Sequence, residues 1–143
     1  MNEDLRKMLE AAREASRGLN RCQEADINRL LLSAAAKVEA AIDKILAANP
    51  AVDLARMDKD NPKYDRLKLT PDRIRAIAAD MRSVASLPSP LRRTLAEWTQ
   101  PNGMRIRKVS VPFGVVGVIY EARPNVTFDV FSILMKSGNA CVL

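Results

Sequence analysis

Apolar side chains recur at three- and four-residue spacing through most of the first hundred residues, which is the pattern of amphipathic helices. Asn49-Pro50 is expected to end the longest of these apolar stripes, and Pro71 suits the first turn of a later helix. The predicted helices cover residues 5–19, 23–48, 51–58, 71 to just before Pro88, and a short segment through Trp98.

The period changes after a turn predicted at residues 100–103. Residues 104–111 read as an extended strand with charges on both faces, because Arg105 and Arg107 point one way and Lys108 the other. A core strand does not carry charges on both faces. This pattern therefore predicts a solvent-exposed ribbon that pairs along its edges.

A continuous run of apolar, mostly β-branched residues occupies 115–119 and is typical of a parallel strand buried on both faces. A helix is predicted from Thr127, as its N-cap, to Ser137, with Gly138 at its C-terminal cap. A second buried strand begins in residues 140–143. The predicted fold class is α/β, with a mainly helical region (1–103), a ribbon strand (104–112) and the opening β-α-β unit of a Rossmann-like domain (113–143).

A polar loop, Tyr120 to Asn125, follows the first buried strand. Ligands of open α/β sheets bind beyond the carboxyl ends of the strands, where this loop lies. The Asn125 amide can donate to a developing oxyanion, and Arg123 can hold a carboxylate or phosphate bidentately. In the alternative, structural interpretation, Asn125 caps the helix and Arg123 pairs with Glu121. Spacing alone leaves both interpretations open.

Composition narrows the classes of function. Hydrophobic residues make up 48% and charged residues 28% of the 143, which indicates a globular protein, and no apolar run approaches the ~20 residues of a membrane span. The net charge is +6, but basic residues are mixed with acids and aromatics are 4%, which favours solvated helix faces over a nucleic-acid interface. Histidine is absent, which excludes histidine bases and histidine metal sites. Cys22 and Cys141 lack the spacing of a metal-binding or redox cysteine motif, so they are interpreted as inert cytoplasmic thiols.

One long segment, "VPFGVVGVIYEARPNVTFDVFSILMKSGNACVL", closely resembles the γ-glutamyl phosphate reductases (glutamate-5-semialdehyde dehydrogenases) of the aldehyde dehydrogenase superfamily. The upstream "DRLKLT", followed by a helix, also fits, so the resemblance spans essentially the whole chain. It implies that 113–143 open an NADPH-binding domain. It also implies reduction of γ-glutamyl phosphate with NADPH, through a cysteine thioester, to glutamate-5-semialdehyde and phosphate in proline biosynthesis.

The resemblance also assigns residues and partners. It implies that the protein is a homo-oligomer in which the ribbon strand pairs with the chain's C-terminal end and a neighbouring subunit. Glutamate 5-kinase is a possible further partner, and neither nucleic acid nor membrane is expected. No segment here resembles the surroundings of the family's catalytic cysteine, so we expect the N-terminal portion of a cytoplasmic enzyme, inactive alone. The expected site residues are Asn125 for the oxyanion, Arg123 and Thr127 for substrate, and Ile119, Tyr120 and Glu121 for cofactor, with no metal.

Three alternatives stay open at this point. Another acyl reductase of the aldehyde dehydrogenase superfamily would share the β-α-β unit and the polar loop. A helical interaction module without enzymatic activity would use the last thirty or so residues as a docking surface. A basic nucleic-acid binder would show salt-dependent affinity for DNA.

Overall fold

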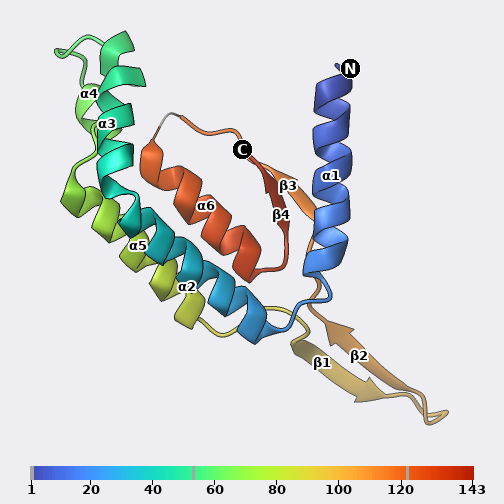
Figure 1. The fold of residues 1–143 in the computed structure, drawn as a ribbon. Helices are drawn as coiled ribbons and strands as arrows, with labels where there is room; N and C mark the ends of the chain where they lie inside the picture. Colours follow the sequence, from blue (N-terminus) through green and yellow to red (C-terminus); the bar gives the residue numbers. More distant parts are fainter. Residues whose placement is uncertain (1, 53, 122) are drawn as a thin grey trace.

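The computed structural model describes residues 2–52, 54–121 and 123–143, and it has a helical layer beside a small parallel sheet (Figure 1). Asp53, within the short helix predicted at 51–58, and Ala122, within the polar loop, lie outside the described residues. The elements in chain order are α1 (Glu3–Leu19), α2 (Glu24–Ala40), α3 (Ile42–Val52), the 3-10 turn η1 (Leu54–Arg56), α4 (Tyr64–Leu67), α5 (Pro71–Ser86), β1 (Thr94–Thr99), β2 (Arg105–Val109), β3 (Val115–Gly117), α6 (Pro124–Lys136) and β4 (Ala140–Val142).

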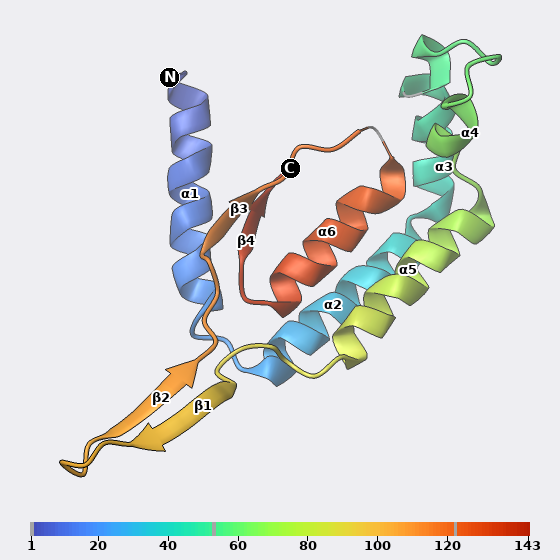
Figure 2. The same ribbon diagram turned by 180° about the vertical axis from the view of Figure 1, so that it is seen from behind.

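The core lies where α2, α5 and α6 pack together, as the views from both sides show (Figures 1 and 2). The apolar stripes predicted on α2 and α5 face each other, and α6 closes the third side with aromatic side chains. Burial of these side chains supplies the main stabilisation of the layer. The buried residues are Ile27, Leu31 and Ala35 on α2 and Ile74, Ile77, Ala78, Met81 and Ala85 on α5, with Phe128, Phe131 and Met135 of α6 packed against them.

The sheet consists of β3 and β4, which pair in parallel with Val115 opposite Ala140 and Gly117 opposite Val142. It lies between α1 on one face and α6 on the other (Figure 1). The predicted β-α-β unit is therefore confirmed. The strand is shorter than the sequence predicts: pairing ends with the bond from Val118 N to Val142 O, and the Ile119 side chain beyond it is fully exposed.

The turn "KSGNA" that joins α6 to β4 is held by buried polar contacts. Gly138 has φ +73°, as the predicted cap requires, and a Cβ there would lie 2.7 Å from Leu91 Cδ1. Asn139 is buried and accepts a hydrogen bond from Gly114 N at 2.9 Å, which fixes the start of β3. The turn therefore sets the register of the sheet.

Lys136, at the end of α6, is 4% exposed and ties three helices together. Its ammonium donates to Asn28 Oδ1 (2.6 Å) and Glu24 Oε1 (3.2 Å) on α2, and to Ala85 O (3.0 Å) on α5. A buried ammonium is stable only when its donors are satisfied in this way. Lys136 therefore fixes α6 against the helical layer.

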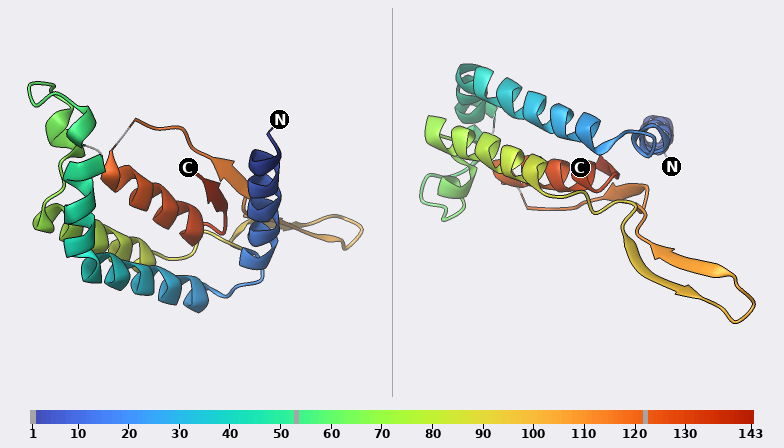
Figure 3. Two further views of the ribbon diagram at one scale, coloured as in Figure 1. Left: turned by 45° about the horizontal axis from the view of Figure 1, so that its top comes forward. Right: turned by 90° about the horizontal axis from the view of Figure 1, so that it is seen from below.

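The segment around Trp98 corrects the sequence interpretation. The short helix predicted through Trp98 is wrong, since this segment forms β1 and pairs antiparallel with β2, with Trp98 opposite Ile106. The predicted ribbon strand is confirmed as β2, and an ion pair between Glu97 and Arg105 joins the two strands. The hairpin projects from the helical body (Figure 3). Further strand partners from another subunit remain a prediction.

Two helix boundaries also differ from the predicted ones. The long apolar stripe predicted at 23–48 is divided at Ala41 into α2 and α3. Asn49-Pro50 does not end the helix but lies inside α3, because the Asn49 side chain bonds to Leu67 O (3.0 Å) and Leu69 N (2.9 Å) and anchors that helix end. The last helix begins at Pro124 instead of after Thr127, since proline suits a first helical turn. Across the described ranges, no helix is both long and apolar enough to cross a membrane.

Candidate functional site

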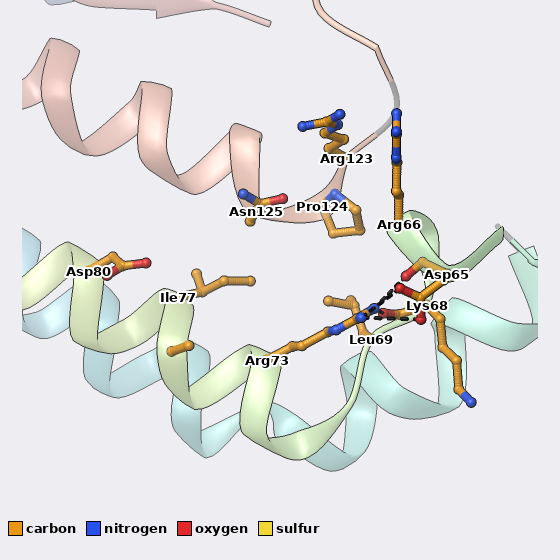
Figure 4. Close-up of a pocket in the computed structure, with 11 residues that line it drawn as sticks. Asp65, Arg66, Lys68, Leu69, Arg73, Ile77, Asp80, Arg123, Pro124 and Asn125 are labelled. Carbon is orange, nitrogen blue, oxygen red and sulfur yellow. Dashed lines mark hydrogen bonds and ion pairs between the residues drawn. The ribbon is translucent and has the colours of Figure 1, made fainter. Parts of the chain in front are cut away.

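A cavity of about 380 Å³ opens between α5 and the N-terminal end of α6, with α4 and the segment after it at one end (Figure 4). This volume is within the ~300–1,000 Å³ typical of small-molecule sites. The cavity lies beside the polar loop that the sequence singled out. Its lining residues are Asp65, Arg66, Lys68, Leu69, Arg73, Ala76, Ile77, Asp80, Arg123, Pro124 and Asn125.

Arg73 braces the wall of the cavity formed by residues 65–70. Its guanidinium donates to both carboxylate oxygens of Asp65 (2.9 and 3.2 Å) and to Lys68 O (2.6 Å). Thr70 caps α5 by accepting from Arg73 N at 3.2 Å. Nη2 makes both contacts to the carboxylate and Nη1 donates to the carbonyl, so this arginine shapes the wall while its charge is already balanced.

Lys68 also lines the cavity, but its ammonium points away from it, so Arg66 and Arg123 are the cations that remain available (Figure 4). Within residues 2–52, 54–121 and 123–143, neither side chain makes a hydrogen bond or ion pair, and both residues are exposed. Arg123 does not pair with Glu121, because Glu121 binds Lys63 Nζ instead, at 2.5 Å. This hydrogen bond lowers the pKa of the Glu121 carboxyl, and the nearby charges of Arg66 and Arg123 add to the effect.

Asn125 lies in the first turn of α6 and lines the same cavity as Arg123. Its side chain does not cap the helix: the N-cap is Arg123, and Asn125 Nδ2 donates to Asp129 Oδ2 at 3.3 Å on the exposed surface. Both structural alternatives for this loop, the Asn125 cap and the Arg123–Glu121 pair, are therefore wrong. What remains is an amide and a guanidinium beside a helix N-terminus, a combination that binds anions.

The other four predicted site residues lie outside the cavity lining. Tyr120 and Thr127 share a hydrogen bond between their hydroxyls at 2.6 Å, so Thr127 fastens the loop to α6 and does not act as the predicted N-cap. Glu121 is tied to Lys63, and Ile119 is exposed at the end of β3. Their assignments to substrate and cofactor stay predictions.

Comparison with known proteins identifies relatives of this chain. No family model matches the chain. The γ-glutamyl phosphate reductases of Phocaeicola vulgatus and Bacteroides thetaiotaomicron are each 57% identical, over 99% and 100% of the chain. The chain is similar in structure to the γ-glutamyl phosphate reductases of Thermotoga maritima (TM-score 0.90, 30% identity, 97% of the chain) and Saccharomyces cerevisiae (TM-score 0.86, 26% identity, 94% of the chain). The resemblance to the γ-glutamyl phosphate reductases is confirmed.

The match covers nearly all of this chain but only about a third of each relative. The chain spans 34% of the length of both bacterial relatives, and 34% and 35% of the two solved chains. The predicted α/β fold, a helical layer that leads into the first β-α-β unit of an aldehyde dehydrogenase-type domain, agrees with these γ-glutamyl phosphate reductase structures.

Sequence reasoning missed most of the residues that line the cavity. Arg66, Arg73 and Asp80 come from the segment that contains "DRLKLT" and from α5. That motif contributed to the resemblance to the γ-glutamyl phosphate reductases, but no role was predicted for its residues. Its density of charge directly before a helix start was a usable signal. What the sequence could not show is that α5 and the start of α6 form opposite walls of one cavity.

Neither cysteine of the chain has the surroundings of a nucleophile. Cys22 is partly buried, and its thiol donates to Gly18 O at 3.6 Å. Burial in β4 raises the pKa of the Cys141 thiol, which disfavours the reactive thiolate. Neither residue lines the cavity. Among the described residues, no cluster of three or more acidic or cysteine side chains could hold a metal ion.

Proposed function

We propose that the protein containing this chain reduces γ-glutamyl phosphate with NADPH to glutamate-5-semialdehyde and phosphate, a reductive step of proline biosynthesis. The observation that carries the proposal is the cavity in which Asn125 lies beside two unpaired cations, Arg66 and Arg123. The relatives named γ-glutamyl phosphate reductase support it, because they match the chain over nearly its whole length.

In this proposal the chain binds and polarises the acyl phosphate. The Asn125 amide donates to the carbonyl oxygen, which gains negative charge as a nucleophile attacks the acyl carbon. Arg123 and Arg66 hold the phosphate that departs when the bond from the acyl carbon to phosphate oxygen breaks. The positive end of the α6 dipole stabilises the same negative charge.

The nucleophile is a cysteine thiolate from a part of the protein outside this chain, and a thioester forms on it. Cys22 and Cys141 are unsuited to this role because of their burial and position. When bound, NADPH supplies the hydride. We propose that part of this cofactor binds beyond the end of β3, at the exposed Ile119 side chain and the braced Tyr120 and Glu121 that follow it.

Three proposals concern the cellular setting of the protein. The projecting hairpin exposes Leu95, Trp98 and Met104, and we propose that it joins copies of the chain in a homo-oligomer (Figure 3). Acyl phosphates hydrolyse readily, so direct transfer from glutamate 5-kinase would protect the substrate. The unpaired Cys22 and Cys141 fit a cytoplasmic location.

A chimera tests the proposed function. Residues 1–143 would replace the matching third of the Phocaeicola vulgatus reductase, and NADPH formation would be followed in reverse, from glutamate-5-semialdehyde, phosphate and NADP. The native reductase serves as the control for folding, by circular dichroism and size-exclusion chromatography. We expect turnover within about tenfold of the control. A folded chimera that oxidises other aldehydes but not glutamate-5-semialdehyde would favour a different acyl reductase, and a folded, inactive chimera would contradict the proposal.

A further inference from the structure

The charges that line the cavity are separated along its length. Arg66 lies toward the end formed by α4. Asp80 lies toward the other end, two turns beyond Arg73 on α5, and Asn125 projects from α6 between these two ends (Figure 4). The remaining acid of the lining, Asp65, is occupied by Arg73. The cavity therefore has an open cationic end and an open anionic end.

Asp80 is not alone at its end of the cavity. In the described parts of the chain its carboxylate makes no hydrogen bond or ion pair, and it lies close enough to Asp129 of α6 for their charges to interact. Burial raises the pKa of the Asp129 carboxyl, and the charge of Asp80 raises it further, while the hydrogen bond from Asn125 opposes the shift. Two carboxylates from facing helices thus repel each other, and among the described residues no cation forms an ion pair with either of them.

A ligand with a positive group at one end and a negative group at the other would relieve this imbalance. γ-Glutamyl phosphate has such groups: its α-carbon, three carbon–carbon bonds from the acyl carbon, carries an ammonium beside a carboxylate, and the phosphate lies on the far side of the acyl carbon. With the acyl oxygen on Asn125 and the phosphate toward Arg66 and Arg123, the α-carbon extends toward Asp80.

We propose that Asp80, supported by Asp129, binds the α-ammonium group of the substrate and so selects amino-acid acyl phosphates over deamino analogues. This inference rests on the proposed function for its orientation of the substrate. It assigns specificity to α5, an element of the helical layer, while the polar loop provides the groups nearest the reacting carbon. An ammonium between two carboxylates is also well satisfied, because it has three donors.

The test compares ligands with and without the amino group, using Asp80→Asn in the chimera. Reverse turnover would be measured with glutamate-5-semialdehyde and with 5-oxopentanoate, which lacks the ammonium. Thermal-shift titrations with L-glutamate and with glutarate give a second readout that needs no turnover. Asp72→Asn is the matched control, since Asp72 is an exposed acid on the same helix whose side chain pairs with Arg75 outside the cavity.

We expect Asp80→Asn to lower kcat/KM for glutamate-5-semialdehyde by roughly 10- to 100-fold, the usual loss for a hydrogen bond between charged groups. Turnover of 5-oxopentanoate should stay unchanged, and the preference for L-glutamate over glutarate should disappear. Equal losses on both aldehydes, or no loss on either, would overturn the inference. If the unsubstituted chimera binds glutamate and glutarate equally, the inference is overturned, whether or not the chimera turns over. If the chimera binds glutamate selectively but shows no turnover, only the proposed reaction is refuted.

Discussion

Substitution of Asn125 by alanine separates catalysis from folding at the polar loop. If the Asn125 amide holds the oxyanion, Asn125→Ala in the chimera should lower the rate of the chemical step by about 10²–10³-fold, the cost of one such donor, or about 2.7–4 kcal/mol. The substitution leaves Arg123 and Arg66 in place, so substrate affinity should change much less than the maximal rate.

The structural contribution of the same side chain is far smaller. Its hydrogen bond goes to Asp129 at 3.3 Å, from the exposed Asn125 to a half-buried partner one helical turn away. Such pairs contribute about 0.2–0.5 kcal/mol, and alanine recovers a similar amount through its higher helix propensity. The expected change in the free energy of unfolding is therefore near zero. An effect on rate of several kcal/mol could not arise from lost stability.

The assay pairs single-turnover kinetics with denaturant unfolding of the same preparations. Asn102→Ala is the control, since Asn102 is an exposed asparagine with one local hydrogen bond, to Met104 N at 3.1 Å in the β1–β2 turn. It should retain full activity. If Asn125→Ala turns over within threefold of the parent, the oxyanion assignment is refuted. If it is inactive but also unfolds at a clearly lower denaturant concentration, the contribution of Asn125 is structural.

Three further predictions concern other parts of the chain. Lys136→Met keeps the side-chain volume but leaves the buried Ala85 carbonyl without its donor, so denaturant unfolding should show a loss of about 2–4 kcal/mol. Gly138→Ala combines a positive φ with a 2.7 Å approach to Leu91, so the loss should be about 1–3 kcal/mol; an unchanged unfolding midpoint would contradict that geometry. The double variant Cys22→Ala, Cys141→Val should retain reverse turnover in the chimera, and its loss in a folded protein would mean that one of these thiols reacts.

The parts of the fold that follow from local pattern were predictable. The apolar stripes of α2 and α5 reach the core as their spacing predicts, and Gly138 takes the left-handed conformation expected at the end of α6. The β-branched run before the polar loop forms β3, although the strand is limited to the three residues that pair with β4.

The errors arose where distant contacts override local preference. Asn49-Pro50 normally ends a helix, yet α3 continues through it because Asn49 is anchored to the backbone on both sides of Lys68. The segment around Trp98 has no clear period of its own, and it becomes a strand because β2 pairs with it across the turn at 100–103. Neither the anchoring of Asn49 by residues 67–69 nor the pairing of β1 with β2 can be predicted from the local sequence alone.

Two residues of the cavity lining were predictable, but the extent of the cavity was not. Arg123 and Asn125 could be singled out because they follow a buried strand and begin a helix. Asp80 could not, since on α5 it reads as one more solvated residue of an amphipathic helix. It becomes a candidate only when α6 lies opposite and leaves a cavity between the two helices.

The two motifs that carry the family resemblance differ in a way that indicates their roles. In "KSGNA", the Lys136 ammonium and the Asn139 amide are buried and satisfied by protein partners, which is the state of groups that hold a fold. In "EARPN", Glu121 pairs with Lys63, whereas Arg123 is exposed and makes no hydrogen bond or ion pair with the described residues, and Asn125 has only a weak surface contact. Exposed groups with contacts this weak contribute little to the stability of the fold, which leaves them available to a ligand. The first motif therefore positions α6, and the second places an amide and a cation at the start of that helix, beside the cavity.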